Sequence, residues 1–320
     1  MRPMRPPRAA LLSLFATRRA LSLTLITFDV DGTLVRGSGQ SSEASVHARA
    51  FAHALGTTLG DGRTPTRLPR EALPGPKYHG STDGLILLNL ARAELGLAPA
   101  TAAPRLPELM NSMHEFVASR ADADVVRGVE PLDGVLPTLR GLAADDRAVC
   151  ALVTGNVEGI ARKKMRAVGV AATGALAPAH PEQLGRAWPG DVGEAFLGGF
   201  GSDFCSGDID DATRQHLDRA EQIVIAHRRA ADGSGGAIRR VVHVGDAPND
   251  VLAARACALD RRLGEGVTVG CVGVATGSYG AEELRACAGE PVPGLWEPVV
   301  LEDGIADPGF VAACGLDSGT

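Results

Sequence analysis

The sequence predicts an α/β fold in which a parallel β-sheet is interrupted, just after its first strand, by an inserted helical segment. Two observations predict this fold. From Pro131 onward, predicted strands alternate with predicted helices, which is the pattern of a parallel sheet with helical crossovers. Between the first strand and Pro131, only helical patterns occur, over about ninety residues. The length of 320 residues is that of about two domains.

The composition excludes several classes of protein. Hydrophobic residues make up 45% of the chain, which is enough for a packed core. Residues 1 to 28 carry five arginines and no acidic residue, so the rest of the chain holds 27 basic and 38 acidic residues, a net charge of -11. With this net negative charge, residues 29–320 are a poor partner for nucleic acid or an anionic membrane. No apolar run approaches the length of about 18 residues that a membrane span needs. We therefore expect neither nucleic-acid binding nor association with a membrane.

The six cysteines show no CxxC or CxxH spacing, and most lie in apolar stretches such as residues 147–153. We interpret them as reduced thiols of the core. The sequence therefore supports neither a disulfide scaffold nor a zinc site.

Residues 1–22 are rich in arginine, contain Ser and Thr and lack acidic residues, which is typical of a mitochondrial or plastid transit peptide. A secretory signal is one alternative, because Ala9 to Ala16 form a short apolar region. Arg18 and Arg19 directly after it make a poor cleavage site, and unpaired cysteines argue against export. The other alternative is a disordered tail on a cytoplasmic protein.

The first strand and the helical segment follow this N-terminal region. Leu21 to Val30 is an apolar, β-branched run with the length of a buried strand. Apolar residues at helical spacing between Val46 and Leu55 predict a first helix, and Leu106 to Val117 predicts another. Between them, residues 81–83 form an N-cap before the apolar run 85–90. The stretch from Gly56 to Pro76 is rich in Gly, Pro and Arg, and we expect an irregular loop there.

The second half of the chain contains the remaining strands of the predicted sheet. The expected elements are a helix near Leu132–Ala144, a strand Ala148–Val153, a helix Val157–Val168, a helix about Ala212–Ala230, a strand Arg240–Val244, a helix after Pro248 and a strand Val267–Val274. Residues 178–208 and 231–237 are rich in Gly or Pro, and we expect loops there. The predicted core domain therefore comprises residues 23–38 and 132–320, and the inserted helical domain comprises residues 39–131.

Polar motifs follow three of the predicted strands. The strands end in Phe28-Asp-Val-Asp-Gly-Thr-Leu34, in Ala151-Leu-Val-Thr-Gly-Asn156 and in Val244-Gly-Asp-Ala-Pro-Asn-Asp250. Each motif by itself is common in turns. In open parallel sheets, however, ligands bind beyond the carboxyl ends of the strands, so we expect these three motifs to converge on one site.

Four carboxylates belong to these strand ends. Asp29 and Asp31 are two residues apart and project the same way from an extended strand, and Gly32 permits the turn that follows. Asp250 lies four residues after Asp246, on the same side of a helix that begins there. Carboxylates that converge in this way repel each other unless a cation joins them, and hard oxygen ligands beside a phosphate indicate Mg²⁺.

Taken together, the motifs Asp29-Val-Asp-Gly-Thr33, Thr154-Gly-Asn156 and Gly245-Asp246 with Asp250 resemble those of the haloacid dehalogenase superfamily. The resemblance is to its phosphatase branch, which includes the phosphoglycolate phosphatase and β-phosphoglucomutase types, and it covers about residues 23–315. It implies a Rossmann-like, three-layer α/β core with an inserted α-helical cap domain. The dehalogenases themselves lack the second acid that Asp31 provides.

The resemblance also implies a role for each motif residue. Asp29 would be the nucleophile, and Asp31 would protonate the leaving group and then activate water. Asp246 would bind Mg²⁺ together with Asp29 and the backbone carbonyl of Asp31, supported by Asp250. The phosphate would be held by Gly32, Thr33, Thr154, Gly155, Asn156 and Lys164. The cap segment Gly80, Ser81, Thr82 and Asp83 would face the substrate, although a simple helix N-cap at Thr82 or Asp83 is the alternative.

The family also uses a lysine near the phosphoryl group, commonly in a Lys-Pro step that this sequence lacks. Only three lysines exist, at positions 77, 163 and 164. Val157, Ile160, Ala161 and Val168 define the apolar face of the helix that follows Asn156, and Lys164 falls in the middle of that face. Lys163 falls off it, toward solvent. We therefore predict Lys164 as the catalytic cation; the alternatives are a snorkelling Lys164 and Arg214 in its place.

These observations support a Mg²⁺-dependent phosphatase that acts on a small phosphorylated metabolite. The alternatives are a phosphomutase of the β-phosphoglucomutase kind and a non-catalytic binding protein on the same fold. A mutase needs a cap cation for a second phosphate, and Arg63, Arg67, Arg70 and Lys77 are available for it.

Overall fold

The computed structural model describes residues 22–36, 45–60, 80–178, 195–233 and 238–316. Of the N-terminal segment predicted to be a transit peptide, residues 1–21 lie outside these ranges. So do most of the loop predicted at residues 56–76 and the four basic residues that a mutase would need, Arg63, Arg67, Arg70 and Lys77.

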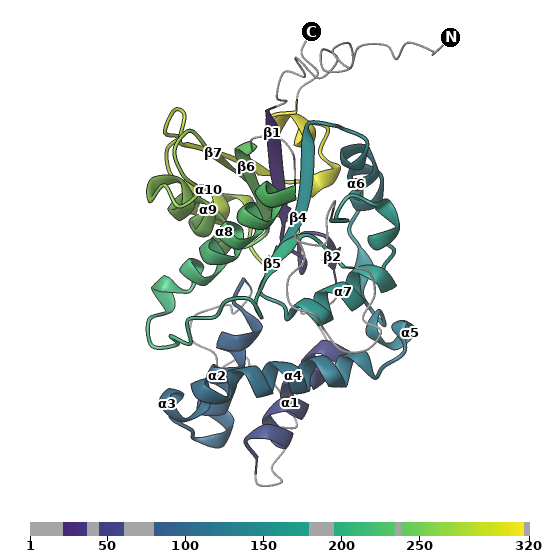
Figure 1. The fold of residues 1–320 in the computed structure, drawn as a ribbon, viewed down its shortest axis with the longest axis vertical. Helices are drawn as coiled ribbons and strands as arrows, with labels where there is room; N and C mark the ends of the chain where they lie inside the picture. Colours follow the sequence, from purple (N-terminus) through teal and green to yellow (C-terminus); the bar gives the residue numbers. More distant parts are fainter. Residues whose placement is uncertain (1–21, 37–44, 61–79, 179–194, 234–237, 317–320) are drawn as a thin grey trace, which may run out of the picture.

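A six-stranded parallel sheet forms the centre of the described structure (Figure 1). Its strands are, in spatial order, β5 (Gly198–Phe200), β4 (Ala148–Thr154), β1 (Leu23–Phe28), β6 (Ile238–Gly245), β7 (Thr268–Val274) and β8 (Trp296–Leu301). β1 is central and buried along its whole length, which explains its continuous apolar run. The chain order reverses on either side of β1, so the carboxyl ends of β4, β1 and β6 meet at one edge.

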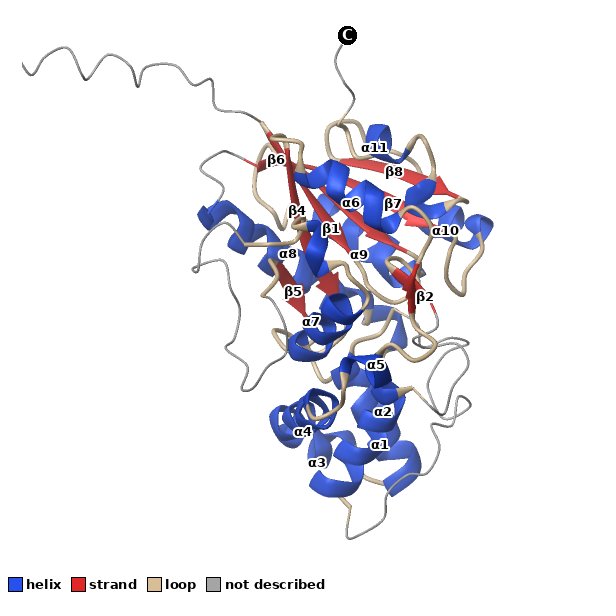
Figure 2. Cartoon of the chain, turned by 90° about the vertical axis from the view of Figure 1, so that its right-hand side faces the viewer, coloured by secondary structure: helices blue, strands red, loops and turns tan. Residues whose placement is uncertain are grey.

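Helices cover both faces of the sheet, which gives the three layers that the sequence predicts (Figures 1 and 2). Alternate residues of β1 face the two sides: Ile26 and Phe28 belong to one apolar cluster, and Leu23 and Leu25 to the other. The first cluster packs against α6 (Val135–Ala143), α7 (Glu158–Ala167) and α11 (Phe310–Ala313). The second cluster packs against α8 (His216–Gly233), α9 (Pro248–Leu259) and α10 (Ala281–Ala288).

The segment between β1 and α6 is helical, as predicted, and its helices lie together beside the sheet in Figure 2. They are α1 (Val46–Thr58), α2 (Asp83–Leu95), α3 (Pro99–Ala102), α4 (Leu106–Ala118) and α5 (Asp122–Val125); we call this segment the helical insertion. The predicted apolar positions of α1 are all buried, and Thr82 caps α2 by accepting a hydrogen bond from the Leu85 amide at 3.3 Å.

A short antiparallel ladder joins the two ends of the helical insertion. β2 (Val35–Arg36) pairs with β3 (Glu130–Pro131), so the chain leaves the core and returns to it side by side. An ion pair between Arg36 and Glu130, 2.6 Å apart, lies across this ladder.

Within the six-stranded sheet, two strands differ from the sequence-based expectation. β5 lies in residues 178–208, where we expected only loops. Its Gly-Gly-Phe sequence carries no β-branched pattern, but a Cβ at Gly199 would lie 2.0 Å from the Gln222 carbonyl oxygen, so glycine is what allows α8 to pack there. β8 is a strand that we did not predict; it contains Pro298, which the sheet tolerates because β8 is an edge strand.

The described residues also bear on the cysteines and on membrane insertion. All six cysteines are free; four of them are buried, and Cys205 and Cys287 are partly exposed. Within the described ranges, no single helix is long and apolar enough to cross a membrane. α2 and α3–α4 reach the required length and composition only as a pair, across a bend of 118°.

Packing between the helical insertion and the core can be tested at Gly159 in α7. A Cβ there would lie 2.1 Å from Nδ1 of His114 in α4, so Gly159→Ala must displace a buried ring. We expect its free energy of unfolding to fall by about 1–3 kcal/mol in denaturant titrations. Gly141→Ala in α6 is the control, because its Cβ would meet nothing within 4 Å; it should be neutral or slightly stabilising. Equal effects of the two substitutions would contradict the described contact.

Candidate active site

The residues predicted to carry chemistry lie beyond the carboxyl ends of β1, β4 and β6, where the structure brings them together. β1 ends at Phe28, and Asp29 and Asp31 follow in the turn. Gly32 has a φ of +94°, and its amide donates to the Val35 carbonyl at 2.8 Å. A Cβ at this position would lie 2.3 Å from Oδ2 of Asp246, so only glycine leaves room for the carboxylate from β6.

Three carboxylates form the centre of the site. Asp29, Asp246 and Asp250 are buried, and each offers an oxygen within 4.8 Å of the oxygens of the other two. The side chain of Asp31 is not part of this group. Thr33 donates a hydrogen bond of 3.3 Å to Asp246, and the Ala247 amide donates one of 3.1 Å to Asp250 at the start of α9.

Arg219, in the first turn of α8, places a guanidinium against these carboxylates. Its Nη1 donates to Oδ1 of Asp29 at 2.6 Å, and its Nε lies 3.4 Å from Oδ1 of Asp250. Nη1 also donates to the Val153 carbonyl at 2.9 Å, and Nη2 donates to the Gly80 carbonyl at 3.3 Å. The Arg219 side chain is only 2% exposed, so the ion pair with Asp29 is fully buried.

The protonation of the three carboxylates reflects burial and mutual repulsion. Burial raises the pKa of Asp29 to about 6; Arg219 opposes this shift, and Asp250 and Asp31 add to it. Burial, and then Asp29 and Asp250, raise the pKa of Asp246 well above its ordinary value. Burial also acts to raise the pKa of Asp250, but Arg219 and His243 outweigh it and lower that pKa.

This group of residues is therefore short of positive charge and fits a divalent cation. Three buried carboxylates face one guanidinium, and two of the three have raised pKa values. Carboxylate oxygens are the ligands that Mg²⁺ prefers, so Asp29, Asp246 and Asp250 could hold it.

A buried histidine in β6 holds the carboxylate of Asp250 in place. His243, in β6, faces Oδ1 of Asp250 with Nε2 at 3.2 Å and the Thr27 hydroxyl with Nδ1 at 2.9 Å. Such a partner orients a carboxylate toward a metal. No sequence pattern pointed to His243, because it lies within an apolar strand.

The end of β4 supplies the predicted phosphate-binding loop. The Thr154 hydroxyl accepts hydrogen bonds from the Asn156 amide at 3.3 Å and from Asn156 Nδ2 at 3.2 Å. Nδ2 also donates to Oδ2 of Asp31 at 2.8 Å, which connects the loop to the β1 turn. The Gly155 carbonyl accepts from the Asp83 amide at 2.8 Å, so the helical insertion touches this loop directly.

Lys164 lies beside Asp31. Its ammonium is 2.9 Å from both Asp31 oxygens and 2.8 Å from Oδ1 of Asn156. The Lys164 side chain is 3% exposed and that of Asp31 is 28% exposed, so the pair lies at the rim of the buried group. The two aspartates of the β1 turn therefore have different partners: Arg219 for Asp29 and Lys164 for Asp31.

The prediction that Lys163 points to solvent is wrong. Lys163 is buried, and its ammonium donates to the Ala118 carbonyl at the end of α4 at 2.9 Å. It also lies 3.7 Å from Asp122 of α5. Helical periodicity placed Lys163 off the apolar face of its own helix, but the helical insertion covers that side as well.

The segment predicted to face the substrate lies against the site. The Gly80 carbonyl accepts from Arg219, and the Ser81 hydroxyl donates to Gln215 at 3.3 Å. Thr82 serves as the N-cap of α2, which was the alternative interpretation of this segment. Asp83 is buried, and its Oδ2 accepts from the Val157 amide at 2.8 Å.

The sequence-based prediction missed Arg219. Its alternative to Lys164 was Arg214, which lies exposed in a 3-10 turn before α8. One signal was available: on helical spacing, Arg219 falls with Gln222, Ile223 and Ala226, all of which are buried. A charged residue on such a face needs a partner, and the same reasoning that selected Lys164 applies to it.

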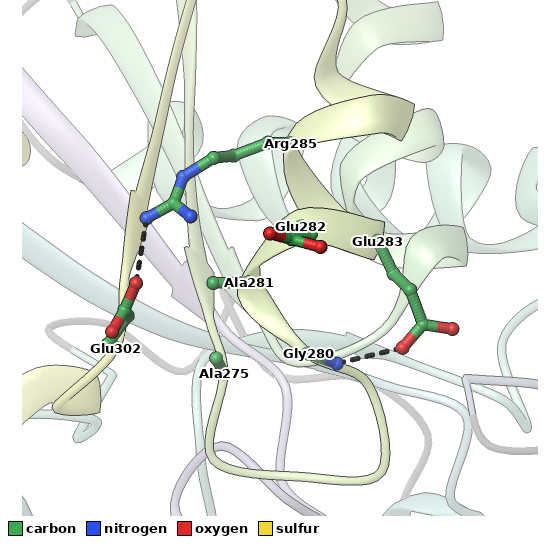
Figure 3. Close-up of a pocket in the computed structure, with 7 residues that line it drawn as sticks. All are labelled: Ala275, Gly280, Ala281, Glu282, Glu283, Arg285 and Glu302. Carbon is green, nitrogen blue, oxygen red and sulfur yellow. Dashed lines mark hydrogen bonds and ion pairs between the residues drawn. The ribbon is translucent and has the colours of Figure 1, made fainter.

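A pocket of about 530 Å³ lies elsewhere, at the ends of β7 and β8 (Figure 3). Arg285 pairs there with Glu302 at 3.1 Å, and Glu283 accepts from the Gly280 amide at 2.9 Å. None of the predicted site residues lines this pocket.

Comparison with known proteins bears on the identity of the site. A model of the haloacid dehalogenase-like hydrolases matches residues 23–258, a range that includes every predicted site residue. Among solved structures, the chain is similar to one described as "Putative beta-phosphoglucomutase from Bacteroides vulgatus", with 16% sequence identity and a TM-score of 0.42. That similarity covers 87% of this chain and 85% of the other. No curated protein matches the sequence.

Removing the buried guanidinium tests the charge balance of the site. Arg219→Gln leaves the carboxylates uncompensated, and we expect the free energy of unfolding without metal to fall by about 3 kcal/mol near neutral pH. Protonation neutralises Asp29 as the pH falls below its raised pKa, so the loss should be smaller at about pH 5 than at about pH 7.5. The exposed Arg214→Gln is the control in urea titrations at both pH values. A loss that grows toward acid pH would contradict this account.

Metal binding should follow the same protonation. Mg²⁺ competes with protons for Asp29 and Asp246, so the rise in Tm that it causes should be larger at about pH 7.5 than at about pH 5. Thermal denaturation with Mg²⁺ or with a chelator measures this difference, and Asp246→Asn should abolish most of it. The prediction fails if Mg²⁺ stabilises the protein equally at both pH values.

Proposed function

We propose, from the premise that the chain belongs to the haloacid dehalogenase-like hydrolase family, that it is a Mg²⁺-dependent phosphatase of small phosphorylated metabolites. Hydrolysis would proceed through an aspartyl-phosphate on Asp29. The observation that carries this proposal is the different pairing of two neighbouring aspartates, Asp29 with Arg219 and Asp31 with Lys164. Two carboxylates in different environments are suited to two different roles.

Asp29, Asp246 and Asp250 are the side chains that would hold Mg²⁺, because their oxygens lie within reach of one ion. When bound, the ion supplies positive charge to the carboxylates and to the phosphate oxygens. His243 holds Asp250, and Thr33 holds Asp246, in the orientation that this requires.

Asp29 is suited to act as the nucleophile. It is 4% exposed, so little water competes with its carboxylate for the phosphorus. Arg219 holds one carboxylate oxygen, Oδ1, at 2.6 Å and leaves the other to attack. The attack forms a P–O bond to Asp29 and breaks the P–O bond to the leaving alcohol.

Asp31 is suited to move the proton. As an acid, it gives a proton to the departing alkoxide; as the resulting carboxylate, it takes one from the water that attacks the aspartyl-phosphate. Asn156 and Lys164 both contact this carboxylate and fix its position. Its side chain is 28% exposed, so solvent water can reach the carboxylate that would take a proton from it.

The loop after β4 is suited to hold the phosphate. Thr154 accepts hydrogen bonds from Asn156, so its own hydroxyl proton remains to donate to a phosphate oxygen. In the first step, Lys164 acts through Asp31, and Arg219 is the cation in direct contact with the nucleophile. This assignment gives Arg219 part of the role that the sequence suggested for Lys164.

A panel of phosphomonoesters, assayed for phosphate release with and without Mg²⁺, tests the function. We expect Mg²⁺-dependent release from at least one small phosphate ester and complete loss of release in Asp29→Asn. If β-glucose 1-phosphate is converted to glucose 6-phosphate faster than phosphate is released, the chain is a mutase instead. Absence of any turnover across the panel would favour a binding protein.

Asp31→Asn should trap the intermediate. With p-nitrophenyl phosphate, whose leaving group needs little protonation, Asp29 can still be phosphorylated, but the base that activates water is missing. We expect a burst of about one equivalent of nitrophenol and a protein that carries one phosphoryl group by mass spectrometry. Asp29→Asn is the control and should show neither. Rapid steady turnover by Asp31→Asn would remove Asp31 from the proposed role.

A further inference from the structure

Lys164 has a partner outside the core. Besides Asp31 and Asn156, its ammonium faces Nδ1 of His47, in α1 of the helical insertion, at 3.1 Å. An ammonium has three N–H bonds and no acceptor, and three side chains surround this one. His47 therefore completes the set of acceptors around a cation that is 3% exposed.

The other nitrogen of His47 fixes the state of its ring. Nε2 lies 3.2 Å from Oδ2 of Asp83, at the start of α2. A carboxylate accepts only, so Nε2 carries the proton and Nδ1 presents a lone pair to Lys164. A proton on Nδ1 would point directly at the ammonium. Asp83 thus selects the one neutral tautomer that serves Lys164.

Packing keeps this arrangement in place. Asp83 is tied to the core by hydrogen bonds to the Val157 amide and the Gly155 carbonyl, both 2.8 Å long. Val157 and the α7 residue Ile160 are buried in the same apolar cluster as the helices of the insertion. His47 also stacks on Phe51 of its own helix, with ring centroids 5.2 Å apart.

Helix α7 holds the insertion at its far end as well. Lys163 caps the last turn of α4, and Arg166 pairs with Asp122 of α5 at 3.0 Å. Lifting the insertion off α7 would expose the shared apolar cluster and leave these cations without their partners. These contacts join the insertion to α7 through both apolar packing and charged side chains.

We propose that His47 is a positioning residue of the reaction: oriented by Asp83, it holds Lys164 and through it sets the geometry of Asp31. The inference rests on the proposed function of Asp31. The helical insertion thus supplies part of the proton-transfer machinery through its own side chains.

The tautomer of His47 is the first test, because it requires no turnover. Nitrogen-15 spectra of the histidine side chains of the full chain, with the His47 signal identified by its loss in His47→Asn, report which nitrogen carries the proton. We expect the Nε2–H form in the wild type at neutral pH and a weaker preference for it in Asp83→Ala, which removes the carboxylate that accepts from Nε2. A wild-type ring protonated at Nδ1 would overturn the proposal.

The second test uses the leaving group. The value of kcat/KM reports the steps up to formation of the aspartyl-phosphate, and only a poor leaving group needs the acid in them. We expect His47→Gln, which reaches Asp83 but offers Lys164 no acceptor, to lower kcat/KM for an alkyl phosphate about 10- to 100-fold. For p-nitrophenyl phosphate the loss should be below about threefold.

Two further variants make this test specific. His47→Asn places its amide oxygen where Nδ1 stands, so it should recover most of the activity on the alkyl phosphate. His53→Asn is the matched control in the same helix; it loses a ring contact with Phe116 and should not depend on the leaving group. Equal losses on both substrates, or equal behaviour of His47→Gln and His53→Asn, would overturn the role of His47. Activity in Asp29→Asn would instead overturn the proposed function itself.

Discussion

The burial of three neighbouring carboxylates is the constraint on which this structure depends, and the ion pair between Arg219 and Asp29 is the interaction that makes it tolerable. The same guanidinium reaches Asp250, the end of β4 and the carbonyl of Gly80. One side chain therefore ties together three strand ends and the helical insertion. Arg219 supplies only one positive charge to three carboxylates. The raised pKa values of Asp29 and Asp246 reflect the burial and the negative charge that Arg219 does not offset.

Two cations divide the site into two environments. Arg219 serves the buried Asp29, and Lys164 serves the more exposed Asp31, although the two aspartates are only two residues apart. This separation supports different proposed roles, attack on phosphorus and proton transfer, for residues of identical chemistry. It depends on two different helices, α7 and α8, which pack against opposite faces of the sheet.

Helix α7 belongs to the core and is also the helix against which the helical insertion packs. Its adjacent lysines face different ways: Lys163 caps a helix of the insertion, and Lys164 points into the site. Because the insertion shares an apolar cluster with α7, its own residues His47 and Asp83 can reach Lys164 in a fixed geometry. The insertion is thus linked to the candidate site by hydrogen bonds as well as by apolar packing.

The sequence by itself determined the α/β fold with its helical insertion, the convergence of the three strand-end motifs and the placement of Lys164 on a buried helix face. These features follow from periodicity and from the polarity of a parallel sheet, which are local properties of the chain. Only the tertiary structure decided that Lys163 is buried, that Arg219 pairs with Asp29, and that His47 and Asp83 stand behind Lys164. Each of these contacts depends on which helix covers a given face of another element. The residues that meet are 36 to 190 positions apart in the sequence, so no local pattern predicts their contact.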